Sequence, residues 1–535
     1  MSDVPQLAFS KAKRQQLWVP LIEKALAKLT GCYANVESGR LAEALGLLTG
    51  APCETLELRA GVNDDGESRP LDTDLLWSKV MSYQSAGFLM GASVSSRGPR
   101  GEDDRSARER AAAAEAMGLI TDHAYSLLGA MACEGARLVK LRNPWGKGEW
   151  RGEYAPGSHL WTERLRREAA ACHSGDGGEG GARSAEGGAG EFWMSWKDFL
   201  TYYATLEACK LRPEWEETRM PLPASLGEFG VLGDMDVTAL RLETVAPTWA
   251  ELTLQQQGSR AQRSAGGGGG GAMLGDLGLA VVWVPGANLE RRDRWSLVGD
   301  SRRTVSTFTT CEVHLPHHGS PAQGGGGCYL AFPTFGFNRA VEGEAQRRGG
   351  GGGGGDGRPG PACCVFSAQP LIITPTQLPL VALATALHLR CKEHGKVTVV
   401  MGHAGFLGGG EVEVGRFYML RSDGGCIVSV ENTSPQHAIE LTVDVQGHNL
   451  SCSRGRGRGG GLRTVDVVPP SRTQIVRIDT QVSHEGGYSY SISTQYRAVP
   501  AGGGGGWGGG GGGAVARSDP AVGAAGLHAP FANVS

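Results

Sequence analysis

A histidine and an asparagine spaced like a catalytic pair lie in the stretch "TDHAYSLLGAMACEGARLVKLRNPWGKGEW", which begins at Thr121. His123 and Asn143 are 143 − 123 = 20 residues apart, with apolar runs typical of strands between them. A hairpin of this length brings the two side chains together on adjacent strands. In covalent catalysis by a thiol, a histidine takes the thiol proton and returns it to the leaving group, and an asparagine orients the imidazole.

The same pattern has a purely structural interpretation. Trp145, two residues beyond Asn143, is placed to shield a histidine–asparagine hydrogen bond from water. However, a lone histidine on a strand is more often structural, and "NPWG" also occurs in ordinary turns. The spacing alone therefore leaves both interpretations open.

Three helices and a buried strand are predicted to surround this stretch. Residues 14–29 place five apolar side chains on one stripe at helical spacing: Leu17, Leu21, Ile22, Ala25 and Leu29. Residues 73–87 are predicted as a helix capped by Thr73, followed by a buried strand in "FLMGASVSS". Residues 195–211 are predicted as one helix capped by Ser195. Its apolar face consists of Phe199, Tyr202, Tyr203 and Leu206.

From about residue 215 the chain becomes a series of short β-branched or aromatic runs divided by Gly, Pro and Ser. This spacing is typical of antiparallel sandwiches. The runs form two sets, and the second includes "VALATALHLRC" at 381–391 as a strand. The apolar window from Pro370 carries three prolines, so we interpret it as an inter-domain connection running into that strand. The expected class is α+β, with a mixed unit followed by two antiparallel β-sandwiches.

The composition argues against several classes of partner. The 52 Lys and Arg nearly balance the 55 Asp and Glu, so the net charge of −3 favours neither nucleic acid nor an anionic membrane. Many of the 85 glycines lie in runs at 266–271, 349–355 and 502–513, which we interpret as flexible insertions. The twelve cysteines show no regular frame and the N-terminus lacks a signal-peptide core, which predicts a reduced, cytoplasmic location. We expect no membrane span and no organic cofactor.

Three parts of the chain resemble calpains, which are cytoplasmic calcium-dependent cysteine endopeptidases with a papain-like centre. The residues "DHAYSL…VKLRNPWGKGEWRGEY…GEFWMSWKDFLTYYATLEACKL" resemble the second protease subdomain. Upstream, "LWVPLIEKALAKLTGCYANVESG" is similar to the stretch that leads out of the first subdomain. The residues "LRTVDVVPPSRTQIVRIDTQVSHEGGYSYSISTQYRA" are similar to the C-terminal C2-like β-sandwich, particularly of plant and algal calpains.

The resemblance implies a division of the chain into four parts. The first is a papain-like second protease subdomain at 1–211, with a Gly-rich insertion at about 173–190. Two C2-like β-sandwiches follow at 215–368 and 380–499, and a disordered Gly-rich tail occupies 500–535.

By the same resemblance His123 is the general base, Asn143 its orienting partner and Trp145 their support. Calpains carry the nucleophile earlier, in a Gly-x-Cys-Trp segment that opens a helix, and this chain has no such segment. Cys32 matches a non-catalytic position, and Cys53 lacks the tryptophan and the helix N-terminus that would lower its pKa. We expect the thiol to lie on residues that this chain does not contain, and autonomous peptidase activity to be lost.

The resemblance also implies a calcium site in the protease subdomain. Glu149 and Glu191 match two carboxylate positions of that site, whereas Pro156 and Ala189 stand where calpains usually have Asp. Calcium takes six to eight oxygen ligands, so we expect a degraded, weakly binding site. Asp122 is a further departure, since calpains commonly have Gly there. It would either raise the pKa of the neighbouring histidine or crowd the substrate.

Two other patterns have weaker chemical interpretations. A zinc set is suggested by Cys311, His314, His317, His318 and Cys328. On a strand, however, Cys311 and His314 point to opposite faces, and the spacing fits no tetrahedral motif, so a surface loop is preferred. The tract "SRGRGRGGG" at 453–461 is short and has no aromatic neighbours, which favours a solvated loop over an RNA-binding segment.

Three functions remain open from the sequence. The first is a calpain-type cysteine endopeptidase that makes limited internal cuts in protein substrates, with an upstream segment or separate chain supplying the thiol-bearing half. The second is a catalytically inactive calpain-like module whose cleft and β-sandwiches bind regulatory partners. The third is an incomplete gene model of an active calpain.

Overall fold

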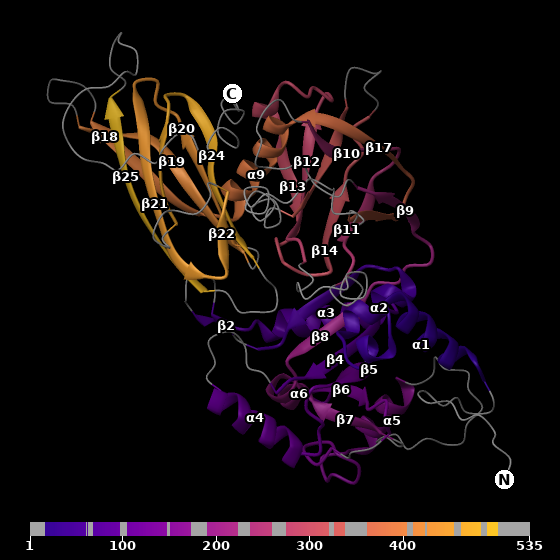
Figure 1. Ribbon diagram of the computed structural model, residues 1–535. Helices are drawn as coiled ribbons and strands as arrows, with labels where there is room; N and C mark the ends of the chain where they lie inside the picture. The colour runs from indigo at the N-terminus through magenta and orange to yellow at the C-terminus, as the bar shows by residue number, and fades with distance from the viewer. Residues whose placement is uncertain are drawn as a thin grey trace. The chain divides into compact units, whose positions relative to one another are not determined.

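The computed structural model describes residues 16–59, 61–62, 68–96, 104–146, 150–172, 190–222, 236–258, 274–319, 326–336, 361–403, 410–422, 425–453, 462–482 and 489–500. The chain forms two compact units, residues 38–213 and residues 214–535 together with 1–37 (Figure 1). The three glycine runs, the insertion at 173–189, residues 454–461 and the tail from 501 lie outside the described residues. Within the described ranges, no helix is long and apolar enough to cross a membrane.

The unit of residues 38–213 is built on a six-stranded antiparallel sheet with the order β1-β8-β4-β5-β6-β7. Its strands are β1 (Cys53–Glu57), β4 (Leu89–Val94), β5 (His123–Cys133), β6 (Ala136–Arg142), β7 (Glu191–Ser195) and β8 (Thr205–Cys209). The short strands β2 (Gly61–Val62) and β3 (Ser68–Arg69) pair with each other. The helices are α2 (Leu41–Thr49), α3 (Thr73–Ser85), α4 (Asp104–Ala116), α5 (Glu163–Ala171) and α6 (Trp196–Tyr202).

Two apolar clusters in this unit cover opposite faces of the sheet. Trp77 of α3 and Phe199 of α6 pack with Leu141 of β6 in the larger cluster. Leu165 of α5 packs with Leu138 of β6 in the smaller one. Because successive strand residues alternate between faces, β6 contributes side chains to both clusters.

The prediction of one helix at 195–211 is wrong for the second half of that range. Ser195 caps α6 as expected, since its Oγ accepts a hydrogen bond from the Asp198 N–H at 3.1 Å. The helix ends at Tyr202, however, and Thr205–Cys209 form β8, which pairs with β1 on one side and β4 on the other. A strand paired on both sides satisfies its backbone groups and buries its side chains, and this tertiary gain outweighs local helix propensity.

The helix predicted at 73–87 is α3, but its cap is Asp72 and not Thr73. Asp72 has extended backbone, and its Oδ1 accepts the Leu75 N–H at 2.9 Å. Aspartate and threonine both suit this position, so the sequence left the exact start of the helix open. The predicted strand after it contains β4.

The helix predicted at 14–29 is α1 (Trp18–Leu29), which precedes the short 3₁₀ helix η2 (Tyr33–Val36). Its apolar stripe faces outward: the side chains of Leu17, Leu21 and Leu29 are 62%, 61% and 60% exposed. The buried residue of α1 is instead the small Ala27. An amphipathic helix normally buries its apolar stripe, so α1 presents a surface without a partner among the described residues.

The first part of the other unit consists of two antiparallel sheets with a shared core. The five-stranded sheet has the order β13-β12-β15-β10-β17 and the four-stranded sheet the order β14-β11-β16-β9. Their strands are β9 (Glu216–Pro221), β10 (Asp236–Thr244), β11 (Thr248–Gln255), β12 (Leu277–Pro285), β13 (Ser296–Asp300), β14 (Phe308–Leu315), β15 (Gly327–Phe335), β16 (Ala362–Ser367) and β17 (Leu371–Pro379). Leu279 of β12 and Leu252 of β11 belong to one buried cluster, so the two sheets pack face to face.

The segment 381–391, predicted as a strand, is a helix. It lies within α9 (Leu380–His394), which begins directly after Pro379. A continuous apolar run fits either a buried strand or a buried helix, and periodicity does not separate them. Leu383 of α9 shares a core cluster with Val282 of β12 and Ile478 of the later strand β24, so the helix is covered by both pairs of sheets.

The last part of this unit is a second pair of antiparallel sheets, with orders β18-β19-β20-β24-β22 and β23-β21-β25. The strands are β18 (Lys396–His403), β19 (Glu411–Ser422), β20 (Gly425–Asn432), β21 (His437–His448), β22 (Leu450–Cys452), β23 (Leu462–Val468), β24 (Arg472–Gln481) and β25 (Ser489–Pro500). Val428 of β20 and Leu441 of β21 belong to the shared core. The predicted mixed class of helix and sheet is confirmed.

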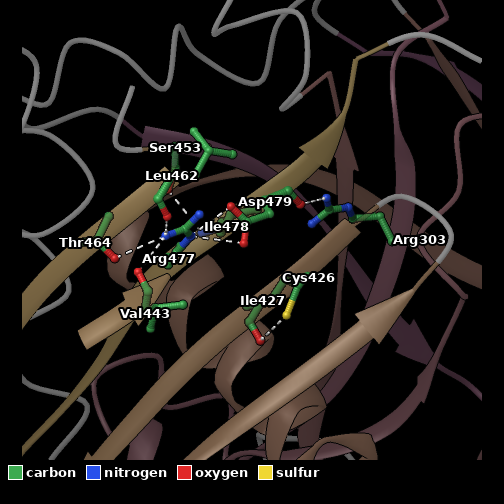
Figure 2. A network of polar contacts seen from close by, with 10 residues as sticks. All are labelled: Arg303, Cys426, Ile427, Val443, Ser453, Leu462, Thr464, Arg477, Ile478 and Asp479. Carbon is green, nitrogen blue, oxygen red and sulfur yellow. Dashed lines mark hydrogen bonds and ion pairs between the residues drawn. The ribbon is translucent and has the colours of Figure 1, made fainter. Parts of the chain in front are cut away.

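A buried polar network joins the two pairs of sheets (Figure 2). Arg477 and Asp479 lie two residues apart on β24, so their side chains share one face of the strand. Arg477 Nε and Asp479 Oδ1 lie 2.8 Å apart, and both side chains are fully buried. Arg477 Nη1 also donates to the carbonyls of Val443 and Leu462 on the facing sheet. From the first pair of sheets, Arg303 donates to the carbonyl of Asp479 at 2.5 Å. This part of the unit is therefore held by polar as well as apolar contacts.

Candidate active site

The β5–β6 hairpin brings His123 and Asn143 together. Glu134 and Gly135 connect the strands, and both have positive φ, as a tight two-residue hairpin turn requires. His123 begins β5 and Asn143 follows the end of β6, so both lie at the same end of the sheet. The distance from His123 Nε2 to Asn143 Oδ1 is 2.9 Å.

The hydrogen bonds around Asn143 define which imidazole nitrogen carries the proton. The backbone N–H of Trp145 can only donate, and it lies 3.0 Å from Asn143 Oδ1, so that atom is the amide oxygen. The same oxygen then accepts a proton from His123 Nε2. In the neutral ring Nδ1 is left as the acceptor, and among the described residues it has no hydrogen-bond partner. Nδ1 is therefore the atom available to take a proton from a thiol.

Two aromatic rings enclose the imidazole. The Trp145 ring centroid lies 4.3 Å from that of His123 at an angle of 47°, and the Tyr125 ring meets His123 edge-on at 5.2 Å. The Tyr125 hydroxyl accepts the backbone N–H of Ile120, and burial raises the pKa of this tyrosine. Asn143 is buried at 2% exposure, whereas the Trp145 side chain is 66% exposed. The indole thus covers the imidazole from the solvent side.

Asp122 is tied to the loop after β4. Its carboxylate accepts hydrogen bonds from the Ser96 backbone N–H at 3.0 Å and from Ser96 Oγ at 2.7 Å. Its φ of 52° is in the left-handed region, where a calpain-like glycine would be unstrained. These bonds connect the end of β4 to the start of β5 beside His123.

Cys53 is far from the imidazole. Across the sheet, Cys53 lies opposite Cys209 and Cys209 opposite Leu89, whereas His123 lies opposite Val94. The separation is three strand spacings across and five residues along β4, or about 20 Å. Cys53 is also buried at 2% exposure, so it is not placed to serve His123.

Two cysteines, Cys172 and Cys32, are exposed. Cys172 ends α5, which packs on the opposite face of the sheet from Tyr125 and Leu141. Burial raises the pKa of the Cys172 thiol and the carboxylate of Glu168 adds to the shift, which disfavours the reactive thiolate. Cys32 is exposed and belongs to the other compact unit.

Of the four positions that the resemblance links to calcium, the structure describes Glu191 and Pro156. Glu191 is bonded to a buried ammonium, since its Oε2 lies 2.7 Å from Lys140 Nζ. Pro156 offers no carboxylate, and Glu149 and Ala189 lie outside the described residues. Within the described part of the chain, no group of three or more His, Cys, Asp and Glu residues could hold a metal ion.

The five residues of the suggested zinc set make other contacts. His317 Nδ1 lies 2.7 Å from the Thr244 carbonyl, and the His318 ring stacks 4.2 Å from that of Trp283. Cys311 and Cys328 are buried, and burial raises the pKa of both thiols. His314 lies 5.1 Å from the ring of Trp249, so the set does not converge.

Sequence reasoning missed several residues that surround the pair. Tyr125 lies two residues after His123 on the same strand, and period-two spacing would have put it on the same face. Ser96 follows β4, Lys140 belongs to β6 and Gly190 precedes β7, and no local pattern in the sequence points to them.

Comparison with known proteins agrees with this geometry. A family described as "Calpain family cysteine protease" matches residues 3–210, and "Calpain-D-like, C-terminal domain" matches residues 408–501. Calpain-type cysteine protease ADL1 of Oryza sativa subsp. japonica is 32% identical over 208 residues, which cover 38% of this chain and 8% of the relative. Calpain-type cysteine protease DEK1 of Arabidopsis thaliana is 33% identical over 210 residues, covering 39% and 8%.

An animal relative shows the same match. The Calpain-1 catalytic subunit of Sus scrofa is 30% identical over 209 residues, which cover 38% of this chain and 25% of the relative. The chain thus matches only a small part of the length of each of these three proteins. The match to the calpain family of cysteine proteases covers residues 3–210, which include His123, Asn143 and the sheet that positions them.

Proposed function

We propose that the chain provides the base and the orienting amide of a calpain-type cysteine endopeptidase. One observation carries the proposal: His123 Nε2 is bonded to Asn143 Oδ1 at 2.9 Å, with Nδ1 left as the acceptor. In this role Nδ1 takes the proton of a thiol, the thiolate attacks a peptide carbonyl, and the imidazolium returns the proton to the leaving amine. The amide of Asn143 keeps the ring oriented throughout.

The thiol comes from a separate segment or chain that carries the other half of the protease core. Cys53 and Cys172 are remote from the imidazole or on the wrong face, which supports an external source. The substrates of the assembled enzyme are proteins cut at limited internal sites.

Around this site we propose a papain-like second protease subdomain followed by two C2-like β-sandwiches. The six-stranded sheet carrying His123 and Asn143 supports the first part, and the two pairs of packed antiparallel sheets support the second. We also propose a cytoplasmic location, because twelve free cysteines suit a reduced compartment. Calcium binding by the protease unit is proposed to be weak, since Lys140 occupies the carboxylate of Glu191.

A second candidate is a calpain-like binding module that does not cleave. The distance of Cys53 from His123 favours it for the chain acting alone. The two candidates differ in whether a thiol-bearing half restores turnover.

The test is reconstitution with a separately produced thiol-bearing subdomain of a plant calpain relative. Cleavage of a peptide substrate by the mixture is expected, with neither part active alone. The variant His123→Ala should abolish turnover, while His159→Ala, an exposed histidine of the same unit, serves as the matched control and should retain it. A folded mixture that binds but never cleaves would favour the binding module.

A further inference from the structure

Lys140 forms a buried ion pair close to the backbone of Asn143. The side chains of Lys140 and Glu191 are 2% and 7% exposed, and Nζ lies 2.7 Å from Oε2. In the β6–β7 register, Lys140 lies opposite Trp193 and Glu191 lies opposite Arg142, so the charged partners are diagonal neighbours on one face. Burying two charges has a large desolvation cost, which makes a specific role for this pair worth seeking.

Gly190, the residue before Glu191, is hydrogen-bonded to Asn143. The backbone N–H of Asn143 donates to the Gly190 carbonyl at 2.9 Å. Gly190 has a φ of +87°, and a Cβ at this position would lie 2.8 Å from Gly146 Cα and 3.0 Å from the Asn143 carbonyl oxygen. The chain entering β7 therefore packs directly against the turn formed by residues 143–146.

We propose that Lys140 is a positioning residue for the His123–Asn143 pair, an inference that rests on the proposed function. The ammonium holds Glu191, and Glu191 fixes the first residue of β7. The carbonyl of Gly190 then holds the backbone of Asn143, so that Oδ1 stays within reach of His123 Nε2. Lys140 acts through these residues and not on the imidazole directly.

This arrangement also bears on the proposed weak binding of calcium. By resemblance, Glu191 matches a calcium-ligand position, yet here its charge is balanced by an ammonium of the same chain. The positive charge that orders the start of β7 is thus supplied by a side chain of the protein, Lys140.

The alternative is that Lys140 only stabilises the fold. A tautomer measurement separates the two roles, because general destabilisation does not select between the two imidazole nitrogens. Nitrogen-15 spectra of histidine-labelled full chain report the ratio of the Nε2–H and Nδ1–H forms of His123, with the signal assigned by His123→Gln. This readout requires no thiol, so it is independent of whether reconstitution succeeds.

The key variant is Lys140→Met, compared with Lys140→Arg and a matched control. The control is Lys210→Met, which removes another buried ammonium, 3.2 Å from Glu54, at the opposite edge of the same sheet. We expect Lys140→Met to lower the ratio of Nε2–H to Nδ1–H roughly 2- to 10-fold, the range for weakening one hydrogen bond. Lys140→Arg should restore the ratio, and Lys210→Met should leave it unchanged.

The proposal is overturned if Lys140→Met keeps the wild-type ratio, or if Lys210→Met shifts it equally. If Lys140→Met does not fold, the double variant Lys140→Met/Glu191→Gln is measured, because it removes both charges of the pair. A folded double variant with a lowered ratio supports positioning. A double variant that is folded with the wild-type ratio, or that is unfolded, shows that the pair serves stability alone.

Discussion

His123 Nε2 and Asn143 Oδ1 are 2.9 Å apart, and the backbone N–H of Trp145 donates to the same oxygen. The oxygen thus accepts two hydrogen bonds, and rotation of the amide away from the ring would break both. This arrangement assigns the proton to Nε2 and leaves Nδ1 as the basic atom. The orientation of the imidazole therefore depends on a side chain that follows a different strand.

Replacing the orienting amide should impair the reconstituted enzyme. In Asn143→Ala the imidazolium formed during catalysis loses an acceptor at Nε2. Hydrogen bonds to charged groups contribute about 1.5–3 kcal/mol, so kcat/KM should fall roughly 10- to 100-fold. The measurement is steady-state kinetics of the mixture, with thermal unfolding as a check on folding. An unchanged kcat/KM would remove Asn143 from the mechanism.

Removing the exposed indole should loosen the site without unfolding it. In Trp145→Ala the Nε2–H of His123 loses the ring that lies 4.3 Å away, so we expect its exchange with solvent to become faster. Because the side chain is 66% exposed, the free energy of unfolding should change by only about 0.5 kcal/mol. Proton exchange measured by magnetic resonance tests the claim. Unchanged exchange would show that the indole does not shield the bond.

Calcium should have little effect on the protease unit. Glu191 is held by Lys140 at 2.7 Å, and Pro156 supplies no carboxylate. A ligand that binds only the native state stabilises it by RT ln(1 + [L]/Kd), so micromolar calcium at a weak site should leave the melting temperature unchanged. The measurement is thermal unfolding with calcium and with chelator. A clear rise in melting temperature that disappears in Glu149→Ala would contradict it.

Glu54 should make stability sensitive to acid. Burial raises the pKa of its carboxyl, but Lys210, Lys79 and Tyr83 together outweigh that effect and lower the pKa to about 2. A lowered folded-state pKa stabilises the protein above the unfolded-state value of 4.5, and this contribution is lost as pH falls towards 2. The contribution is at most about 3 kcal/mol. Glu54→Gln should be less stable than wild type at pH 7, and the difference should shrink below pH 4.5. A pH-independent difference would contradict this assignment.

Arg303 should couple the two pairs of sheets. Arg303 donates a hydrogen bond to the Asp479 carbonyl. Its Nε also lies 3.1 Å from Asp276 Oδ2, and the side chains of Arg303 and Asp276 are 1% and 0% exposed. Removing one partner of a buried pair costs about 3–5 kcal/mol, so Arg303→Leu should lower the unfolding free energy of the β-rich unit by that amount. Arg291→Leu, at the exposed pair with Asp293, is the control and should have no measurable effect. Equal stability of the two variants would show that the network contributes nothing.

The elements that could be predicted from the sequence are those whose signals lie within a few residues of one another. The spacing of His123 and Asn143 on either side of a two-residue turn predicted the hairpin, and Ser195 predicted the start of α6. Most of the β-strands after residue 215 were recognisable from alternating β-branched runs between turn residues. In each case backbone preference and side-chain period act along the chain.

Other features depended on residues that are distant in sequence. Thr205–Cys209 became a strand because β1 and β4 lie on both sides of it, and 381–391 became a helix because both pairs of sheets cover it. The stripe of α1 was predicted correctly as a pattern, but its exposure depends on which surfaces the fold provides.

The sequence by itself determined the chemical groups and their hairpin, because a base and its orienting amide need only the right residues on adjacent strands. The tertiary structure alone decided which nitrogen of His123 is bonded to Asn143, where Cys53 and Cys172 lie, and that Lys140 holds Glu191 beside Asn143. These outcomes depend on strand order and on the face that each side chain occupies. Both are set by long-range packing, which no local pattern encodes.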